Sequence, residues 1–237
     1  FDSVSLWDKV SANNHYDPES FAPLKALLDL IKSGEHEQSQ TLLSELMDME
    51  AWGRFSAFET LASTKHYGKA HNWRIYFDPW RGKLMPVVWD PAGWIWNPPE
   101  PMFNMVSSRL HQLLFQNGDF LRARSAAFTS FFDSGKDTYF LESVSDTIEM
   151  MTAEIKTDAF LRPGSAAIVA KAMYKLEEKI RKTFSTTQKK WAGDHNSGTR
   201  FSYHDTHLDL SVGGNRPVQA IRLNFDRELK PTASSTI

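Results

Sequence analysis

The sequence predicts an α+β fold that is mainly helical, with a central β-hairpin and a β-rich C-terminal tail. Apolar residues recur at helical spacing between residues 21 and 63, and again for about 85 residues from Met102 onward. Between these two regions, residues 75–89 alternate as strands do around a turn that contains proline and glycine. Short apolar segments bounded by Gly213-Gly214 follow in the tail. These observations place most of the chain in helices and two short regions in strands.

Composition is that of an ordinary globular protein. The chain has 237 residues, of which 41% are hydrophobic and 24% are charged, enough for one large domain or slightly more. A net charge of −2 favours neither nucleic acid nor an anionic membrane surface as a partner. Cysteine is absent, which excludes disulfides and thiolate chemistry. No apolar run is long enough to span a bilayer, so we predict no membrane span.

Caps and apolar spacing set the helices in order. Asp48 is a suitable N-cap for the third of them, and Asn117-Gly118 opens the fifth. The predicted helices cover residues 21–31, 39–47, 49–63, 105–115, 119–132, 137–156, and from Pro163 or Ser165 to about 187. The aromatic stripe on the third helix is interpreted as core, and it consists of Trp52, Phe55, Phe58 and Leu61.

The hairpin has a polar residue at each end. Asn72 enters it and Asp90 leaves it, while residues 78–83 form its turn and residues 84–89 its apolar return strand. A hairpin brings the chain back to where it started, so the amide and the carboxylate are expected to converge. An oxygen-rich pair with one full negative charge is what a hard cation requires. We therefore expect Asn72 and Asp90 to share a metal ion, within roughly 5 Å of each other.

The segment after the hairpin, Pro91 to Pro99, is rich in proline and tryptophan. Three prolines and a glycine predict an irregular, rigid loop. It is interpreted either as a packed surface loop or as a wall for a substrate or partner.

The hairpin segment resembles the signature of the CotH-type spore-coat kinase family. The resemblance rests on His71-Asn72, an aromatic-rich strand, a turn with Asp78-Pro79 and Gly82-Lys83, and Trp89-Asp90 at the end. It extends as a helical pattern from about Leu27 to about Trp191. It implies a protein-kinase-like C-lobe over residues 1–195, in which Asn72 and Asp90 bind Mg²⁺ against the phosphates of ATP. Residues 196–237 then form a β-rich tail that is compatible with the start of a second domain.

The chain departs from the kinase pattern at the catalytic base. The expected aspartate lies five residues before the metal asparagine, and Tyr67 stands there instead. Residues 64–70 contain no carboxylate. His66 is the one neighbour able to accept a proton near neutral pH. His66 and the Tyr67 position are therefore the candidate catalytic residues, with loss of the base as the simpler interpretation. Residues 1–36 also lack a kinase N-lobe, and no phosphate-binding glycine loop occurs.

Three functions remain open. The first is an atypical protein kinase that binds ATP and Mg²⁺ and phosphorylates a protein substrate. The second is a non-catalytic, kinase-derived module that binds a coat or surface protein. The third is a metal-dependent hydrolase that uses Asp90 with His195, His204, Asp205 and His207, although these histidines are interpreted as a solvated loop. For location, the bacterial spore coat, the cell surface and the cytoplasm all stay open.

Overall fold

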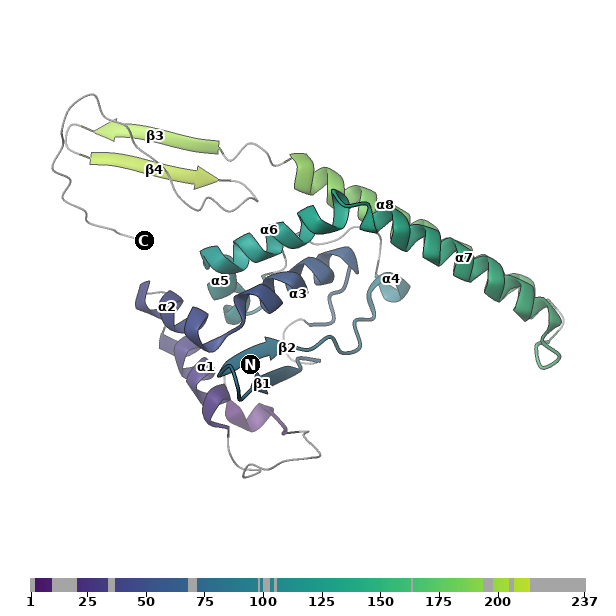
Figure 1. Cartoon of the computed structure of the whole chain (residues 1–237), viewed down its shortest axis with the longest axis horizontal. Coiled ribbons are helices and arrows are strands. Elements are labelled where there is room, and N and C mark those ends of the chain that lie inside the picture. The colour runs from purple at the N-terminus through teal and green to yellow at the C-terminus, as the bar shows by residue number, and fades with distance from the viewer. Residues whose placement is uncertain are drawn as a thin grey trace.

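The computed structural model describes residues 3–9, 21–33, 37–67, 72–97, 99, 103–104, 106–162, 164–193, 198–204 and 207–213. Figure 1 shows a helical body with a small hairpin beside it, a long helical arm, and a second hairpin toward the C-terminal end of the chain. The helices are η1 (Val4–Leu6), α1 (Ala22–Ser33), α2 (Glu37–Leu46), α3 (Met49–Leu61), α4 (Gly93–Trp96), α5 (Arg109–Phe115), α6 (Gly118–Phe132), α7 (Lys136–Thr157) and α8 (Ser165–Gly193). The strands are β1 (Ile75–Asp78), β2 (Lys83–Pro86), β3 (Gly198–His204) and β4 (His207–Gly213).

The α+β class is confirmed, and most helix boundaries lie within a few residues of those that the sequence predicts. The cap predictions are also correct. The Asp48 carboxylate accepts a hydrogen bond from the Ala51 amide at 3.0 Å, and the Asn117 side chain accepts one from the Phe120 amide at 3.0 Å. Within the described residues, no helix combines the length and the apolar composition that crossing a membrane requires. The expectation of no membrane span agrees with this finding.

Two predictions about elements were wrong. The loop after the hairpin contains one helical turn, α4, where an irregular segment was expected. This turn begins only after Pro91, so the proline does not interrupt its hydrogen bonds. The return strand of the hairpin ends at Pro86 rather than at residue 89. Beyond it, the Val87 amide still donates to the Arg74 carbonyl at 2.9 Å, which holds the chain beside its partner for one more residue.

Helix α3 lies at the centre of the body. Trp52 and Phe55 are buried, as predicted, and the indole of Trp52 donates to the Leu84 carbonyl of β2 at 3.0 Å. Phe58 and Leu61 are only half-buried, so the stripe is not core throughout. Burial extends instead around most of the helix, since Gly53, Ser56, Ala57, Glu59 and Thr60 are also buried. A helix enclosed by neighbours on several sides shows no single apolar stripe.

The hairpin is tied to the start of α3. Strands β1 and β2 are antiparallel, and Phe77 pairs with Leu84. Gly82 takes a left-handed conformation with φ of 63° in the turn, as a tight turn requires. Arg81 in the turn pairs with Asp48 at 2.6 Å. Burial alone raises the pKa of Asp48, but the Ala51 amide and Arg81 together hold this pKa below its ordinary value.

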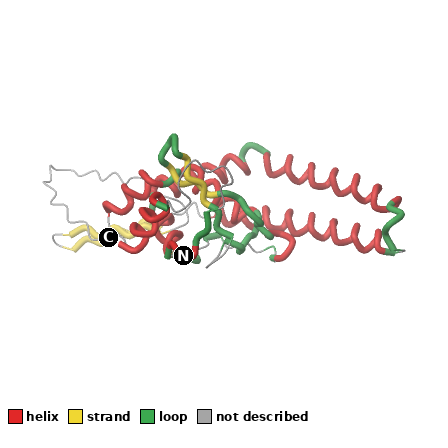
Figure 2. Tube along the Cα trace, turned by 90° about the horizontal axis from the view of Figure 1, so that it is seen from below, coloured by secondary structure: helices red, strands yellow, loops and turns green. Residues whose placement is uncertain are grey.

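Helices α7 and α8 form an arm that leaves the body. Figures 1 and 2 both show the two helices side by side and antiparallel, joined at the far end by a short loop. At the base of the arm, Phe140 and Phe184 pack against Trp94 of α4. Lys179 also donates to the Trp94 carbonyl at 3.1 Å. The arm is therefore anchored at one end and extended at the other.

Strands β3 and β4 lie in the tail, for which the sequence predicts short strands over residues 199–203, 208–212 and 218–225. They pair as an antiparallel hairpin in which His204 lies opposite His207. The third predicted strand, residues 218–225, lies outside the described residues, as does most of the 196–237 tail. Residues His195 and Asp205 also lie outside them.

The close approach of α3 and α6 requires glycine at residue 53. A Cβ there would lie 2.6 Å from Ala123 Cβ and 2.7 Å from the Arg124 amide nitrogen. We expect Gly53→Ala to lower the free energy of unfolding by about 3 kcal/mol, because backbone atoms cannot move aside cheaply. The matched control is Gly118→Ala, whose Cβ would meet nothing within 4 Å. Thermal melts that place the two variants at the same transition temperature would contradict this prediction.

Candidate functional site at the mouth of the hairpin

Three separate segments meet at the open end of the hairpin. They are the loop after α3, Asn72 just before β1, and Asp90 after β2. His66 from the first segment connects the other two. Its Nδ1 lies 2.7 Å from the Asp90 carbonyl oxygen and 3.6 Å from the carboxylate Oδ2, and 2.8 Å from the Asn72 side-chain nitrogen. Thr64 also donates its hydroxyl to the Pro91 carbonyl. The structure thus brings Asn72, His66 and Asp90 together.

The contact between His66 and the Asp90 carbonyl favours one tautomer of the ring. A carbonyl oxygen only accepts, so the contact with Asp90 requires a proton on Nδ1. In the neutral ring the lone pair then lies on Nε2, which is 2.9 Å from the Asn72 amide nitrogen. The Asn72 amide nitrogen is almost equidistant from the two ring nitrogens, at 2.8 Å from Nδ1 and 2.9 Å from Nε2, so it lies beside the ring and not along the lone pair of Nε2.

Backbone strain is concentrated around these residues. Four non-glycine residues in the described part of the chain have positive φ: Ser63 (52°), Asn72 (65°), Asp90 (43°) and Ala92 (49°). Each such conformation costs on the order of 1–3 kcal/mol and persists only where its surroundings enforce it. All four belong to the segments that meet at His66. Such clustering is typical of functional sites.

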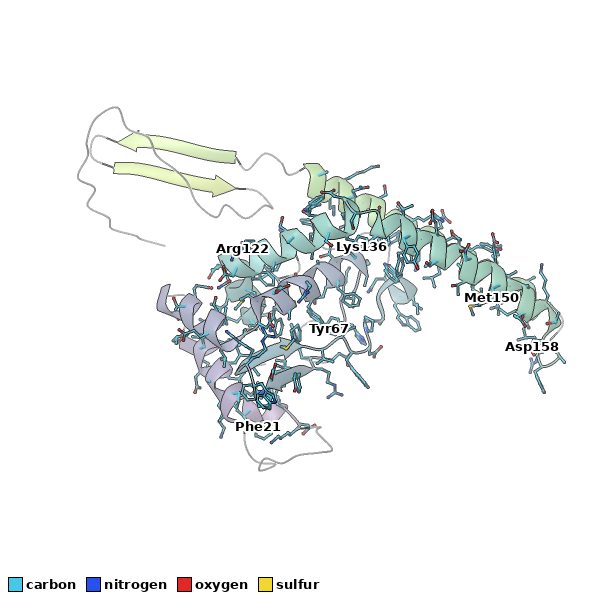
Figure 3. All side chains as sticks on the ribbon, in the orientation of Figure 1. Phe21, Tyr67, Arg122, Lys136, Met150 and Asp158 are labelled. Atoms are coloured by element: carbon cyan, nitrogen blue, oxygen red, sulfur yellow. The ribbon has the colours of Figure 1, made fainter. Side chains whose placement is uncertain are left out.

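Tyr67 is a core residue. Its side chain is 0% exposed, and its ring lies 4.9 Å from that of Phe55, centroid to centroid. Figure 3 shows it in the body between α3 and the hairpin. The phenol oxygen accepts a hydrogen bond from the Trp89 amide at 3.1 Å. Burial raises the pKa of Tyr67, and the nearby charges of Glu59 and Asp90 raise it further. The side chain at the position of the expected base is therefore a neutral phenol away from solvent.

A buried pair of ionisable residues lies behind the site. Glu59 on α3 is 4% exposed, and its Oε1 has no hydrogen-bond partner among the described residues. Burial raises the pKa of Glu59 to about 8, although the charge of Arg124 offsets part of the shift. Glu59 is therefore mostly protonated at neutral pH.

Arg124 on α6 is as buried as Glu59, but its guanidinium has several hydrogen-bond acceptors. Its guanidinium donates to the Ser56 and Thr60 hydroxyls at 3.1 and 3.4 Å and to the Phe103 carbonyl. It also lies over the ring of Phe128, 5.0 Å from the centroid. Burial lowers the pKa of Arg124 to about 10, so it remains charged near neutral pH. The sequence analysis identified neither Glu59 nor Arg124 as a site residue. The signal that could have found them is a charged residue on an otherwise apolar face of a predicted helix.

The segment after Asp90 is held against the C-terminal end of α3 by hydrogen bonds and close packing. Trp94 donates its indole N–H to the Leu61 carbonyl at 2.7 Å, and Asn97 donates to the Ser63 carbonyl at 2.8 Å. A Cβ on Gly93 would lie 2.1 Å from the Ala62 carbonyl oxygen, so only glycine fits there. These contacts fix the residues on either side of Asp90 and His66. Of the two interpretations of this segment, they support packing against the body.

Aromatic and apolar side chains are exposed along the hairpin and in the segment after it, some near Asp90 and others, such as Trp80, in the turn at the opposite end. The Arg74 guanidinium lies over the Trp89 ring, 5.1 Å from its centroid. The large apolar side chains exposed on the hairpin and the following segment are Tyr76, Trp80, Val87, Val88, Trp89, Ile95 and Trp96. Next to Asp90 in the chain, the carboxylate, the amide and the imidazole are accompanied by the exposed side chains of Val88 and Trp89.

The donor set agrees with a weakly held hard cation. The Asn72 side-chain nitrogen and the Asp90 carboxylate lie 2.8 and 3.6 Å from the same atom, Nδ1 of His66, so the imidazole is in contact with both groups. A Mg²⁺ ion is typically held by one or two carboxylates together with waters and phosphate oxygens. One carboxylate and one amide oxygen fit that pattern once His66 turns aside. Among the described residues, no group of three or more histidine or acidic side chains could hold a metal by itself.

A cavity of about 920 Å³ lies elsewhere on the body. Side chains of α3, α6, α7 and α8 line it, together with Trp94. None of Asn72, His66 and Asp90 contributes to its lining. The candidate site is thus an open surface feature and not part of this cavity.

No protein-family model matches this chain, and neither a curated protein nor a solved structure is significantly similar to it. The CotH-type resemblance therefore stays a prediction that rests on its own residues.

Proposed function

We propose that this chain is a CotH-like atypical kinase domain that binds ATP with Mg²⁺ through Asn72 and Asp90. In this proposal it transfers phosphate to a protein substrate slowly or not at all. The observation that supports it best is the convergence of Asn72 and Asp90 on His66 in a locally strained backbone. The convergence brings together the two residues for which the resemblance implies metal binding, although 18 residues separate them in the sequence.

The roles of the residues follow from their chemistry. The Asp90 carboxylate and the Asn72 amide oxygen would hold the cation, which would in turn neutralise charge on the phosphates. The Arg74 guanidinium makes a cation–π contact with the Trp89 ring, and in this proposal both side chains would contact the nucleotide. Phosphoryl transfer depends mostly on positioning and electrostatics, so weak activity can survive without a dedicated base.

The burial of Tyr67 supports slow or absent transfer. A neutral phenol away from solvent cannot accept the proton of a substrate hydroxyl, and losing a general base typically costs about 10²- to 10⁴-fold in rate. His66 is the alternative base. The Asn72 amide nitrogen lies beside its ring and not along the lone pair of Nε2, which would accept the proton.

The second candidate is a non-catalytic module that assembles with a coat or surface protein. The exposed apolar side chains of the hairpin and of the segment after it favour it, particularly Val88, Trp89 and Trp96. Clustered exposed aromatic residues are common at protein–protein contacts. This candidate needs the same fold but no metal.

Calorimetric titration with ATP and Mg²⁺ tests the proposal. We expect saturable heat for the wild type and none for Asp90→Asn, with an unchanged melting temperature for the variant. The matched control is Asp146→Asn on the exposed surface of α7, which should bind as the wild type does. Absence of Mg-dependent binding by a folded wild type would overturn the proposal and leave the assembly module.

A transfer assay with radiolabelled ATP then separates an active from an inactive domain. Binding without transfer supports the inactive form, in which His66 does not replace the missing aspartate. Transfer that Asp90→Asn and His66→Ala both abolish supports His66 as the base. Robust transfer that His66→Ala leaves unchanged would contradict both the inactive form and the histidine base.

A further inference from the structure

The α7–α8 arm exposes apolar side chains along its free length. Of residues 136–162 and 164–179, only Ile148 is buried. Met150 and Ile168 are 62% and 71% exposed, and Phe160 at the tip is 98% exposed. Figure 3 places Met150 and Asp158 on the part of the arm far from the body. Two helices packed only on each other cannot bury more than one side of each, so the outer sides stay in solvent.

Charge is divided between the two helices of the arm. Helix α7 is acidic, and its only basic residues are Lys136 and Lys156. Its acidic residues are Asp137, Glu142, Asp146, Glu149 and Glu154. Helix α8 is basic, and its only acidic residues are Glu177 and Glu178. Its basic residues are Lys171, Lys175, Lys179, Arg181, Lys182, Lys189 and Lys190. The two helices therefore have opposite net charge.

Among the residues that the structure describes, no ion pair joins α7 to α8. In the part of the chain that the structure describes, the one ion pair in the arm joins Glu177 and Arg181, both of α8. Glu142, Asp146 and Glu149 of α7 form no ion pair with described residues. The same holds for Lys171, Lys175 and Lys182 of α8, which are also exposed. Glu177 and Arg181 contact Ser145 of α7, whereas the six other charges named here are exposed and do not join α7 to α8.

We propose that the arm is a homodimerisation surface, with α7 of one copy against α8 of the other. Each arm carries one acidic helix, α7, and one basic helix, α8. If two copies are related by a two-fold axis parallel to the arm, α7 of each copy lies opposite α8 of the other. Unlike charges then face each other at two places in the dimer. The exposed apolar residues would then be enclosed in a four-helix bundle, as in helical bundles in general. A second copy is a suitable partner because the same chain provides both an acidic helix and a basic helix of opposite charge. The inference is independent of the proposed nucleotide site.

Two charge-reversed variants of the full chain test the proposal by sedimentation velocity. In the first, α7 becomes basic through Glu142→Lys, Asp146→Lys and Glu149→Lys. In the second, α8 becomes acidic through Lys171→Glu, Lys175→Glu and Lys182→Glu. All six side chains are exposed, so circular dichroism should show unchanged helix content. The control is Trp80→Ala, an exposed side chain in the hairpin turn.

We expect the wild type and Trp80→Ala to sediment at twice the chain mass of 27.1 kDa at roughly 0.05 M salt, where screening is weak. The dimer should weaken at roughly 0.5 M salt, because exposed charges are then screened. Each reversed variant alone should be monomeric, since like charges would face each other. An equimolar mixture of the two should dimerise again, because both unlike contacts return. A monomeric wild type at low salt, or a dimer that survives both reversals, would overturn the proposal.

Discussion

Replacing Tyr67 with aspartate is expected to unfold most of the body instead of restoring a proton acceptor. The ring is 0% exposed and lies between Phe55 and Trp73, so its removal leaves a large cavity. Truncating a buried aromatic residue costs about 3–5 kcal/mol, and the new carboxylate would also lose its hydration. Urea denaturation should show a loss of at least about 4 kcal/mol, or no folded protein at all.

Tyr67→Phe is the matched control for this prediction. It keeps the ring but removes the oxygen that accepts from the Trp89 amide. The expected loss is about 1–2 kcal/mol, the cost of one buried donor left without a partner. A folded Tyr67→Asp protein with the stability of Tyr67→Phe would show that the ring is not enclosed as described. A carboxylate meant to act as a base would be better tolerated at exposed Lys65 in the same loop.

Glu59→Gln is expected to remove a pH dependence of stability that the wild type shows. Burial raises the pKa of Glu59 from 4.5 to about 8, so the folded state binds a proton that the unfolded state releases. Its contribution to stability is fully present below pH 4.5 and is lost as the pH rises through 8. Wild-type stability should therefore fall by about 2 kcal/mol between roughly pH 6.5 and 8.5, and that of Glu59→Gln should not.

The pH window for this measurement is set by a second buried group. Burial lowers the pKa of His111 from 6.5 to about 4, so its contribution is present above pH 6.5 and is lost as the pH falls through 4. The two groups oppose each other in acid, and only Glu59 acts above pH 6.5. Urea denaturation of wild type, Glu59→Gln and the exposed control Glu142→Gln separates them. The prediction fails if Glu59→Gln and the wild type lose stability in parallel.

Local sequence determined the helices, their caps and the hairpin. Asp48 and Asn117 cap helices because their short side chains reach the backbone amides of the first turn, which depends on neighbouring residues alone. The turn around Gly82 depends on the conformational freedom of glycine in the same way. The hairpin then brings Asn72 near Asp90 because its two strands are antiparallel. These features follow from residues close together in the chain.

Only the tertiary structure decided how those elements are used. Nothing near Tyr67 in the sequence predicts that its ring is enclosed by Phe55 and Trp73, and nothing places His66 between Asn72 and Asp90. Glu59 and Arg124 lie 65 residues apart, and the charge of Arg124 reaches Glu59 because α3 and α6 pack closely together. Burial and the electrostatics that follow from it depend on contacts between distant segments, whereas caps and turns depend on adjacent ones. The sequence by itself therefore predicted the helices, the strands and the residues of the candidate site. The packing of other segments around α3 decided how exposed these residues are, which of them are charged, and which of them are in contact.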